Sequence, residues 1–143
     1  MREILFRGKV IETHWVEEDI RGEWVEGSLV HQTEYYGDPV DRYHILYTGE
    51  FDFDYYDSAI VDPETIGQFT GLCDKNGKKI FDGDIVKFKS GEIRTVVFDE
   101  QYAEFEFSRN DPVENVDSVC LCVDHDVCEV IGNVYDNPEL LGK

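Results

Sequence analysis

The sequence predicts a mainly β protein, built from antiparallel strands with minimal helix. Short runs of β-branched and aromatic residues recur along the chain, and Gly, Asn, Asp and Pro separate most of them. With 143 residues, 41% hydrophobic and 13% aromatic, the chain has the size and content of one folded domain. We therefore expect a single domain over residues 1–143, with a β meander at 1–60 and a hairpin and barrel-like portion at 61–143.

The first part of the chain contains four expected strands and one expected loop. The loop covers Thr33–Arg42, because it includes Gly37-Asp38-Pro39. The strands, identified by their β-branched and aromatic content, are Glu3–Phe6, Lys9–Glu12, Glu23–Glu26 and Tyr43–Tyr47.

Acidic and aromatic side chains alternate from Phe51 to Tyr55. In a strand this alternation points Phe51, Phe53 and Tyr55 to one face, which we expect to face inward. The alternative is an exposed acidic and aromatic strand that serves as an interaction surface.

A tight hairpin is expected at Asp74-Lys75-Asn76-Gly77. A two-residue turn on Asn76-Gly77 would set Lys75 opposite Lys78, which is a like-charge pair. A type I turn with Gly77 in the left-handed conformation sets Asp74 opposite Lys78 instead. We therefore predict the second register, with positive φ at Gly77 and with Leu72 opposite Ile80.

The hairpin leads into further antiparallel strands. Phe81-Asp82-Gly83-Asp84 forms a second turn into Ile85–Phe88, and Ser90-Gly91 turns the chain into Arg94–Phe98. Consecutive strands joined by such short turns suit a small SH3-like barrel, which removes exposed strand edges.

The last part of the chain continues the β pattern, with a loop at Ser108–Asp117. Strands are expected at Glu104–Phe107, Ser118–Val123 and Cys128–Tyr135. Single helical turns are expected at Asp62–Thr65, with Asp62 as the cap and Pro63 in the first position, and at Asn137–Leu141.

The formal charge of −19 is unevenly distributed. Residues 1–60 carry 5 basic and 14 acidic side chains, residues 96–143 carry 2 and 12, and residues 61–95 carry six of each. Repulsion by the acidic flanks disfavours nucleic acid and anionic membranes as ligands. The neutral middle part supplies the candidate binding surface, which consists of Lys75, Asn76, Lys78 and Lys79.

Four soft ligands follow one another near the C-terminus, in Cys120-Leu121-Cys122-Val123-Asp124-His125-Asp126-Val127-Cys128. Cys120, Cys122, His125 and Cys128 give the number of ligands that a structural zinc site needs, although such sites favour wider cysteine pairs. Packing of small apolar thiols is the favoured interpretation, because free cysteine is among the most buried residue types. We expect no cofactor.

No set of residues predicts an enzyme. Acidic pairs such as Asp52/Asp54 and Asp82/Asp84 are expected in so acidic a chain, and we interpret them as solvated acids and, at 82–84, as a turn. His14, His31 and His44 are isolated, without a nucleophile, phosphate loop or metal-ligand spacing beside them.

The cysteine content and the N-terminus predict a cytoplasmic protein with free thiols. The chain has four cysteines, no signal-peptide pattern and no apolar run near the ~18 residues that span a bilayer.

Four blocks of the sequence together resemble the YopX family of bacteriophage and prophage proteins. The blocks are Met1–Lys9, Gly22–Leu29, Val61–Phe88 and Glu129–Leu140. The resemblance implies phage or prophage origin, a location inside the bacterial host cell and a mainly β fold, and it implies no activity, cofactor or catalytic residue.

These observations predict a non-enzymatic phage or prophage accessory protein that contacts an unidentified host or phage protein. The alternative is an acidic mimic of nucleic acid that inhibits a host DNA- or RNA-binding protein. A homo-oligomer is compatible with a β domain of this size, and no residue requires it.

Overall fold

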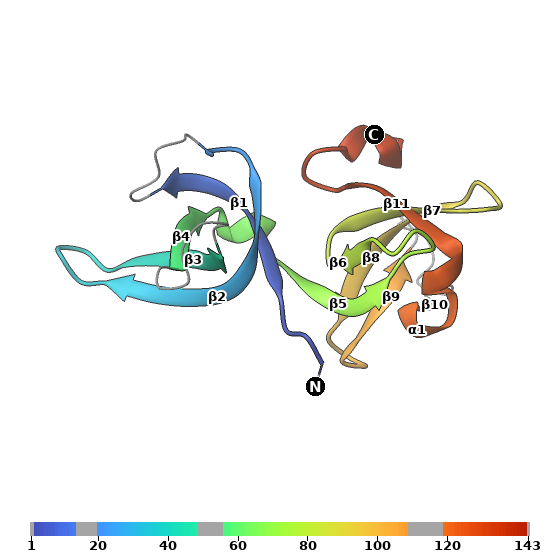
Figure 1. Cartoon of the computed structure of the whole chain (residues 1–143), viewed down its shortest axis with the longest axis horizontal. Helices are drawn as coiled ribbons and strands as arrows, with labels where there is room; N and C mark the ends of the chain where they lie inside the picture. The colour runs from blue at the N-terminus through green and yellow to red at the C-terminus, as the bar shows by residue number, and fades with distance from the viewer. Residues whose placement is uncertain (1, 14–19, 49–55, 109–118, 143) are drawn as a thin grey trace. The chain divides into compact units, whose positions relative to one another are not determined.

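The structure is a computed structural model that describes residues 2–13, 20–48, 56–108 and 119–142. The chain forms two compact units, Met1–Gln68 and Phe69–Lys143, which we call the N-terminal and the C-terminal unit. Each has its own hydrophobic core. Figure 1 labels the elements.

Strands dominate both units, as the sequence predicts. The elements of the N-terminal unit are β1 (Phe6–Thr13), β2 (Trp24–Glu34), β3 (Val40–Thr48), β4 (Tyr56–Val61), the 3-10 turn η1 (Pro63–Thr65) and the start of β5 (Gly67–Cys73). Those of the C-terminal unit are the rest of β5, β6 (Lys79–Phe81), β7 (Asp84–Phe88), β8 (Ile93–Asp99), β9 (Glu104–Ser108), β10 (Val119–Cys120), α1 (Leu121–Asp124), the 3-10 turns η2 (His125–Val127) and η3 (Pro138–Leu141), and β11 (Cys128–Asn133).

The strands β1 to β4 close into a small antiparallel barrel. β2 pairs with β3 and β3 with β4, and β1 completes the ring by pairing with β2 through Phe6–Lys9 and with β4 through Val10–Thr13. The change of partner coincides with a register shift between Val10 and Glu12. The expected small barrel is therefore confirmed. Its closed ring lies in the part for which the sequence predicted a meander, because this irregularity in β1 was not visible in the residue pattern.

Two glycines permit the strands of the barrel to approach closely. A Cβ at Gly27 would collide with the carbonyl oxygen of Leu46 on β3, and a Cβ at Gly8 would come within 2.8 Å of the Val61 side chain. The enclosed core consists of Val10, Ile45, Ala59 and Val61, surrounded by partly buried residues that include Phe6, Val25, Leu29 and Tyr47.

The C-terminal unit contains a five-stranded antiparallel sheet with the order β10-β9-β8-β7-β11. Its core combines this sheet with the hairpin of β5 and β6, since Ile80 of β6 and Leu72 of β5 both pack into it. The buried members of the cluster are Ile80, Val86, Val96, Phe107, Leu121, Cys128 and Val130.

One strand prediction in the C-terminal unit is wrong. Ser118–Val123 was expected to be extended, but the strand covers only Val119–Cys120 and the chain then turns into α1. Leu121 packs into the core with 2% of its surface exposed, and this tertiary contact overrides the strand propensity of the run.

Several predictions for the N-terminal unit need correction. Of the expected strand Glu3–Phe6, only Phe6 lies in a strand, because β1 begins there. The expected loop Thr33–Arg42 is shorter, because β2 continues to Glu34 and β3 begins at Val40. The strand β4 was not predicted, and the residues expected to form an inward-facing strand, 51–55, lie outside the described ranges.

Both predicted helical turns are confirmed as 3-10 turns. Asp62 caps η1 by accepting the backbone N–H of Glu64 at 3.0 Å, and Pro63 is its first residue. The second is η3. Within the described ranges, no helix has both the length and the apolar character needed to cross a membrane.

Candidate functional site

The turn between β5 and β6 is the candidate site that the sequence predicted, and the predicted pairing of Asp74 with Lys78 is confirmed. The Asp74 N–H donates to the Lys78 carbonyl at 2.8 Å, so these two residues lie opposite each other. Gly77 has φ +79° and donates its N–H to the Asp74 carbonyl. Before the turn, the pairing register of β5 and β6 shifts between the pairs Phe69/Phe81 and Cys73/Lys79. Gly71, which lies within this stretch of β5, has φ +87°.

The side chain of Asp74 fixes this turn to the rest of the unit. One carboxylate oxygen accepts the backbone N–H groups of Asn76 and Lys78, and the other accepts that of Val130 on β11, each at 2.9 Å. Burial by itself would raise the pKa of Asp74, but these three hydrogen bonds and the charge of Lys78 outweigh it and lower the pKa. The Lys75 N–H adds a second link by donating to the Cys128 carbonyl.

The four candidate binding residues occupy two different environments. Lys75, Asn76 and Lys78 are exposed at the turn, and we call these three residues the cationic turn. The Nζ atom of Lys75 lies 3.7 Å from a carboxylate oxygen of Glu129, in a largely solvated contact. Lys79 is half-buried, with its Nζ atom 5.7 Å from the centre of the Phe69 ring.

The next turn contains a carboxylate that the sequence analysis placed wrongly. Asp84 was interpreted as a solvated acid, but only 1% of its surface is exposed. Its carboxylate accepts the Phe81 N–H at 2.8 Å, and Gly83 between them has φ +89°. The prediction of a turn at 82–84 is therefore confirmed, and the buried acid forms part of its framework.

The four candidate zinc ligands do not form one cluster. Cys128 is fully buried and its thiol donates to the His125 carbonyl at 3.3 Å, while Nδ1 of His125 donates to the Cys73 carbonyl at 2.8 Å. Cys120 and Cys122 contact each other, with 2.6 Å between their sulfur atoms. Among the residues that the structure describes, no three His, Cys, Asp or Glu side chains lie close enough together to hold a metal ion.

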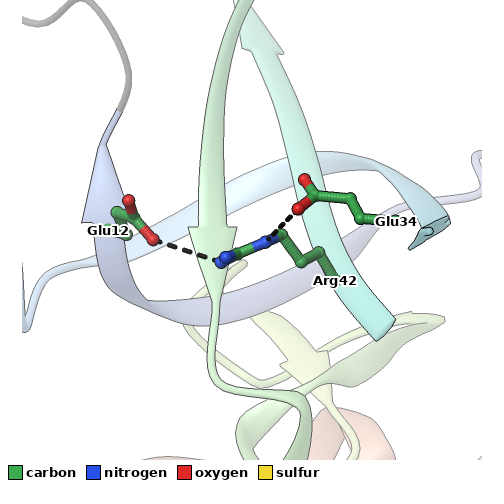
Figure 2. Close-up of polar contacts among 3 residues, drawn as sticks. All are labelled: Glu12, Glu34 and Arg42. Atoms are coloured by element: carbon green, nitrogen blue, oxygen red, sulfur yellow. Dashed lines mark hydrogen bonds and ion pairs between the residues drawn. The ribbon is translucent and has the colours of Figure 1, made fainter. Parts of the chain in front are cut away.

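An ion-pair cluster on the barrel was missed by the sequence analysis. Figure 2 shows the Arg42 guanidinium of β3 between the carboxylates of Glu34 on β2, at 3.0 Å, and Glu12 on β1, at 3.3 Å. Nearby on β2, His31 stacks on Tyr43 and contacts the Asp41 carboxylate. Arg42 was not singled out because its two partners are 8 and 30 residues away in sequence.

A small hollow of about 130 Å³ lies on the C-terminal unit. Arg94, nearly buried, donates there to the Glu92 carboxylate at 3.0 Å and to the Phe107 carbonyl at 3.4 Å. The lining residues are Phe88, Ser90, Glu92, Arg94, Val119 and Asp124. This set contains no nucleophile paired with a base, so it supports no particular reaction.

Comparisons with known proteins identify a family and a similar solved structure. The sequence model of a family described as "YopX protein" matches residues 10–142, which span both units. No curated protein matches the sequence. The chain is similar to the protein in the "Crystal structure of protein EF1440 from Enterococcus faecalis", with 26% identity, a TM-score of 0.41, and coverage of 78% of this chain and 75% of that chain.

Proposed function

The chain belongs to the YopX family, and from this premise we propose that it is a non-enzymatic accessory protein of a phage or prophage. In this proposal it acts in the cytoplasm of the bacterial host through contact with another protein. The cationic turn is its contact surface, and the partner presents an acidic surface.

The observation that supports this surface is the rigidity of an exposed turn. Asp74 accepts three backbone N–H groups from the turn and from β11, and the Lys75 N–H donates to Cys128. These hydrogen bonds hold the backbone of Lys75, Asn76 and Lys78 before any partner binds. The backbone of the turn therefore loses little conformational entropy when a partner binds, which improves affinity without additional contacts.

The charge distribution explains why a protein is the proposed partner. The turn offers two exposed lysines, while the whole chain has a net charge of −19. Nucleic-acid affinity grows with the number of phosphates that cationic side chains neutralise, so two lysines in an acidic chain provide little. Specific binding to an acidic patch on a protein needs only a few matched charge contacts.

Affinity capture with matched charge variants tests the proposal. The full chain, a Lys75→Gln/Lys78→Gln variant and a control Lys87→Gln/Lys89→Gln variant are each incubated with nuclease-treated bacterial lysate. The two variants each remove two positive charges from exposed lysines of the C-terminal unit. We expect a partner that is retained by the control and lost, at least tenfold, with the turn variant. Equal retention by both variants would contradict the cationic turn as the contact surface.

The second candidate function, mimicry of nucleic acid, is favoured by the formal charge of −19. A mimic would bind a DNA- or RNA-binding protein through many carboxylates and would not depend on the turn. Its binding would weaken steeply with salt, since the Debye length falls from ~30 Å at 0.01 M to ~10 Å at 0.1 M. A nucleic-acid-binding partner that both lysine variants retain and that moderate salt releases would therefore replace the first proposal by the second.

A further inference from the structure

The sulfur atoms of Cys120 and Cys122 lie side by side on the C-terminal unit. Their separation is 2.6 Å, and both cysteines are free thiols. Cys122 is exposed and Cys120 is partly buried. Solvent therefore reaches one thiol directly, and the second thiol lies beside it.

The two thiols lie close together because the chain passes from a strand to a helical turn between them. In a regular strand, residues two apart are separated by about 6.6 Å along the chain, which would keep their sulfur atoms apart. Here Cys120 ends β10 with φ of −55° and ψ of 132°, and α1 begins at Leu121. Leu121 inserts into the core, so the cysteines on either side of it turn toward each other on the outside.

The other two cysteines have different surroundings. The Cys128 thiol is buried and donates to the His125 carbonyl, and burial raises its pKa to about 11. Cys73 lies on β5 and is partly buried. Of the four thiols, the described contacts place only Cys120 and Cys122 against each other.

We propose that Cys120 and Cys122 form a dithiol site that low-molecular-weight disulfides oxidise reversibly. The inference does not depend on the proposed function.

The reaction is two successive thiol–disulfide exchanges. The deprotonated sulfur of Cys122 attacks a disulfide R–S–S–R, forms a mixed disulfide and releases one thiol R–SH after protonation. The sulfur of Cys120 then attacks Cys122, which forms the internal disulfide and releases the second R–SH. Two protein thiols are oxidised and one small disulfide is reduced, so the electrons balance.

The contact between the thiols also affects the pH dependence of the reaction. The hydrogen bond with Cys120 raises the pKa of Cys122, and the first attack requires the thiolate. The charge of Glu104 on β9 also raises the pKa of Cys122. We therefore expect the rate of oxidation to increase as the pH rises from 7 toward 9.

Oxidised glutathione added to the folded full chain tests the site. We expect the wild type to lose two of its four thiols and two hydrogens in mass, with a Cys120–Cys122 cross-link in the peptide map. Cys73→Ser, the control, should form the same cross-link. Cys120→Ser should stop at a lasting glutathione adduct on Cys122, and dithiothreitol should restore all thiols in the wild type.

Three results would overturn the proposal. These are a wild type that ends as a glutathione adduct, a cross-link that involves Cys73 or Cys128, and a cross-link that dithiothreitol does not open. Circular dichroism of the serine variants shows whether they are folded.

A trivalent monoaryl arsenical tests the same juxtaposition without oxidation. The probe is phenylarsonous acid, in which arsenic carries one phenyl group and two hydroxyl groups. It exchanges the two hydroxyl groups for two thiolates, releases two waters, and binds tightly only where both thiols are within reach. We expect the wild type and Cys73→Ser to bind one equivalent, and Cys120→Ser and Cys122→Ser to bind at least tenfold more weakly. Equal binding by all four proteins would show that Cys120 and Cys122 do not act as a pair.

Discussion

The two units of this protein are closed by different physical means. The N-terminal unit is closed by backbone ladders, since β1 pairs with both β2 and β4, and its charged cluster at Arg42 lies on the outside. In the C-terminal unit, the β5–β6 hairpin is joined to β11 by the carboxylate of Asp74, of which 6% is exposed. Steric fit at the backbone should therefore govern the first unit, while hydrogen bonds to the buried carboxylate of Asp74 should hold the hairpin of the second.

Gly27→Ala should have the largest effect, and it should act on the N-terminal unit. The new Cβ would collide with the Leu46 carbonyl oxygen, which belongs to the backbone and cannot rotate away. We expect a loss of about 3 kcal/mol in the free energy of unfolding. Hydrogen exchange should accelerate for amides of β1 to β4 and stay slow for β7 and β8. Slow exchange throughout the barrel would show that β2 and β3 can move apart at Gly27 without loss of stability.

Asp74→Ala should have the next largest effect, and it should act on the C-terminal unit. It removes the acceptor of three backbone N–H groups, one of them the buried N–H of Val130. We expect a loss of about 2 kcal/mol in denaturant unfolding, with faster exchange of the Val130 amide. Asp41→Ala on the barrel is the control, because it removes an exposed carboxylate. If both variants were equally stable, the proposed role of Asp74 would be wrong.

Acid should weaken the C-terminal unit through the same carboxylate. Because the pKa of Asp74 is lowered in the folded state, its ionised form stabilises the fold at pH values above the unfolded pKa of about 3.9. This stabilisation disappears as the pH falls through the lower pKa of the folded state. The difference in unfolding free energy between wild type and Asp74→Asn should therefore be constant from pH 7 to 5 and shrink below pH 4. A difference in unfolding free energy that stays constant down to pH 2 would contradict the stabilising role of the ionised Asp74 carboxylate.

Gly77→Ala should have a smaller effect on the same hairpin. Gly77 has φ +79°, and no atom lies within 4 Å of the position that a Cβ would take. The cost is therefore conformational only, about 1 kcal/mol in the free energy of unfolding. Asn at this position, which tolerates positive φ better, should recover part of the loss. Thermal unfolding of the two variants measures the difference, and equal loss in both would point to a steric cause.

Arg42→Gln should have the smallest effect. Its ion pairs with Glu12 and Glu34 are partly solvated, so their removal should cost below about 1 kcal/mol in the free energy of unfolding. The difference should decrease at high salt, because screening weakens exposed ion pairs. Lys89→Gln, with the same change of charge, is the control. A loss as large as that of Asp74→Ala would mean that charge, and not the backbone ring, closes the barrel.

Predictions that depend on neighbouring residues were the most accurate. The register at Asp74 and Lys78 and the positive φ of Gly77 follow from local charge and turn geometry, and the structure has both. The cap at Asp62 followed in the same way. The candidate binding residues are largely exposed, as a surface requires, although Lys79 lies against Phe69.

Predictions that depend on distant residues failed or were not made. Nothing near Asp74 in sequence indicates that Val130 would donate to it, 56 residues away. The strand predicted through Leu121 ends before it, because the Leu121 side chain packs into the core. The helical turn that begins there also places Cys120 and Cys122 in contact.

The sequence by itself determined a β fold with short turns, because strand propensity and turn chemistry act over a few residues. It also determined the acidic charge, the family and the register of one hairpin. Only the tertiary structure decided where the barrel closes, that Asp84 is buried, and which thiols meet. These features depend on packing between residues far apart in the chain, which strand propensity and turn chemistry do not specify.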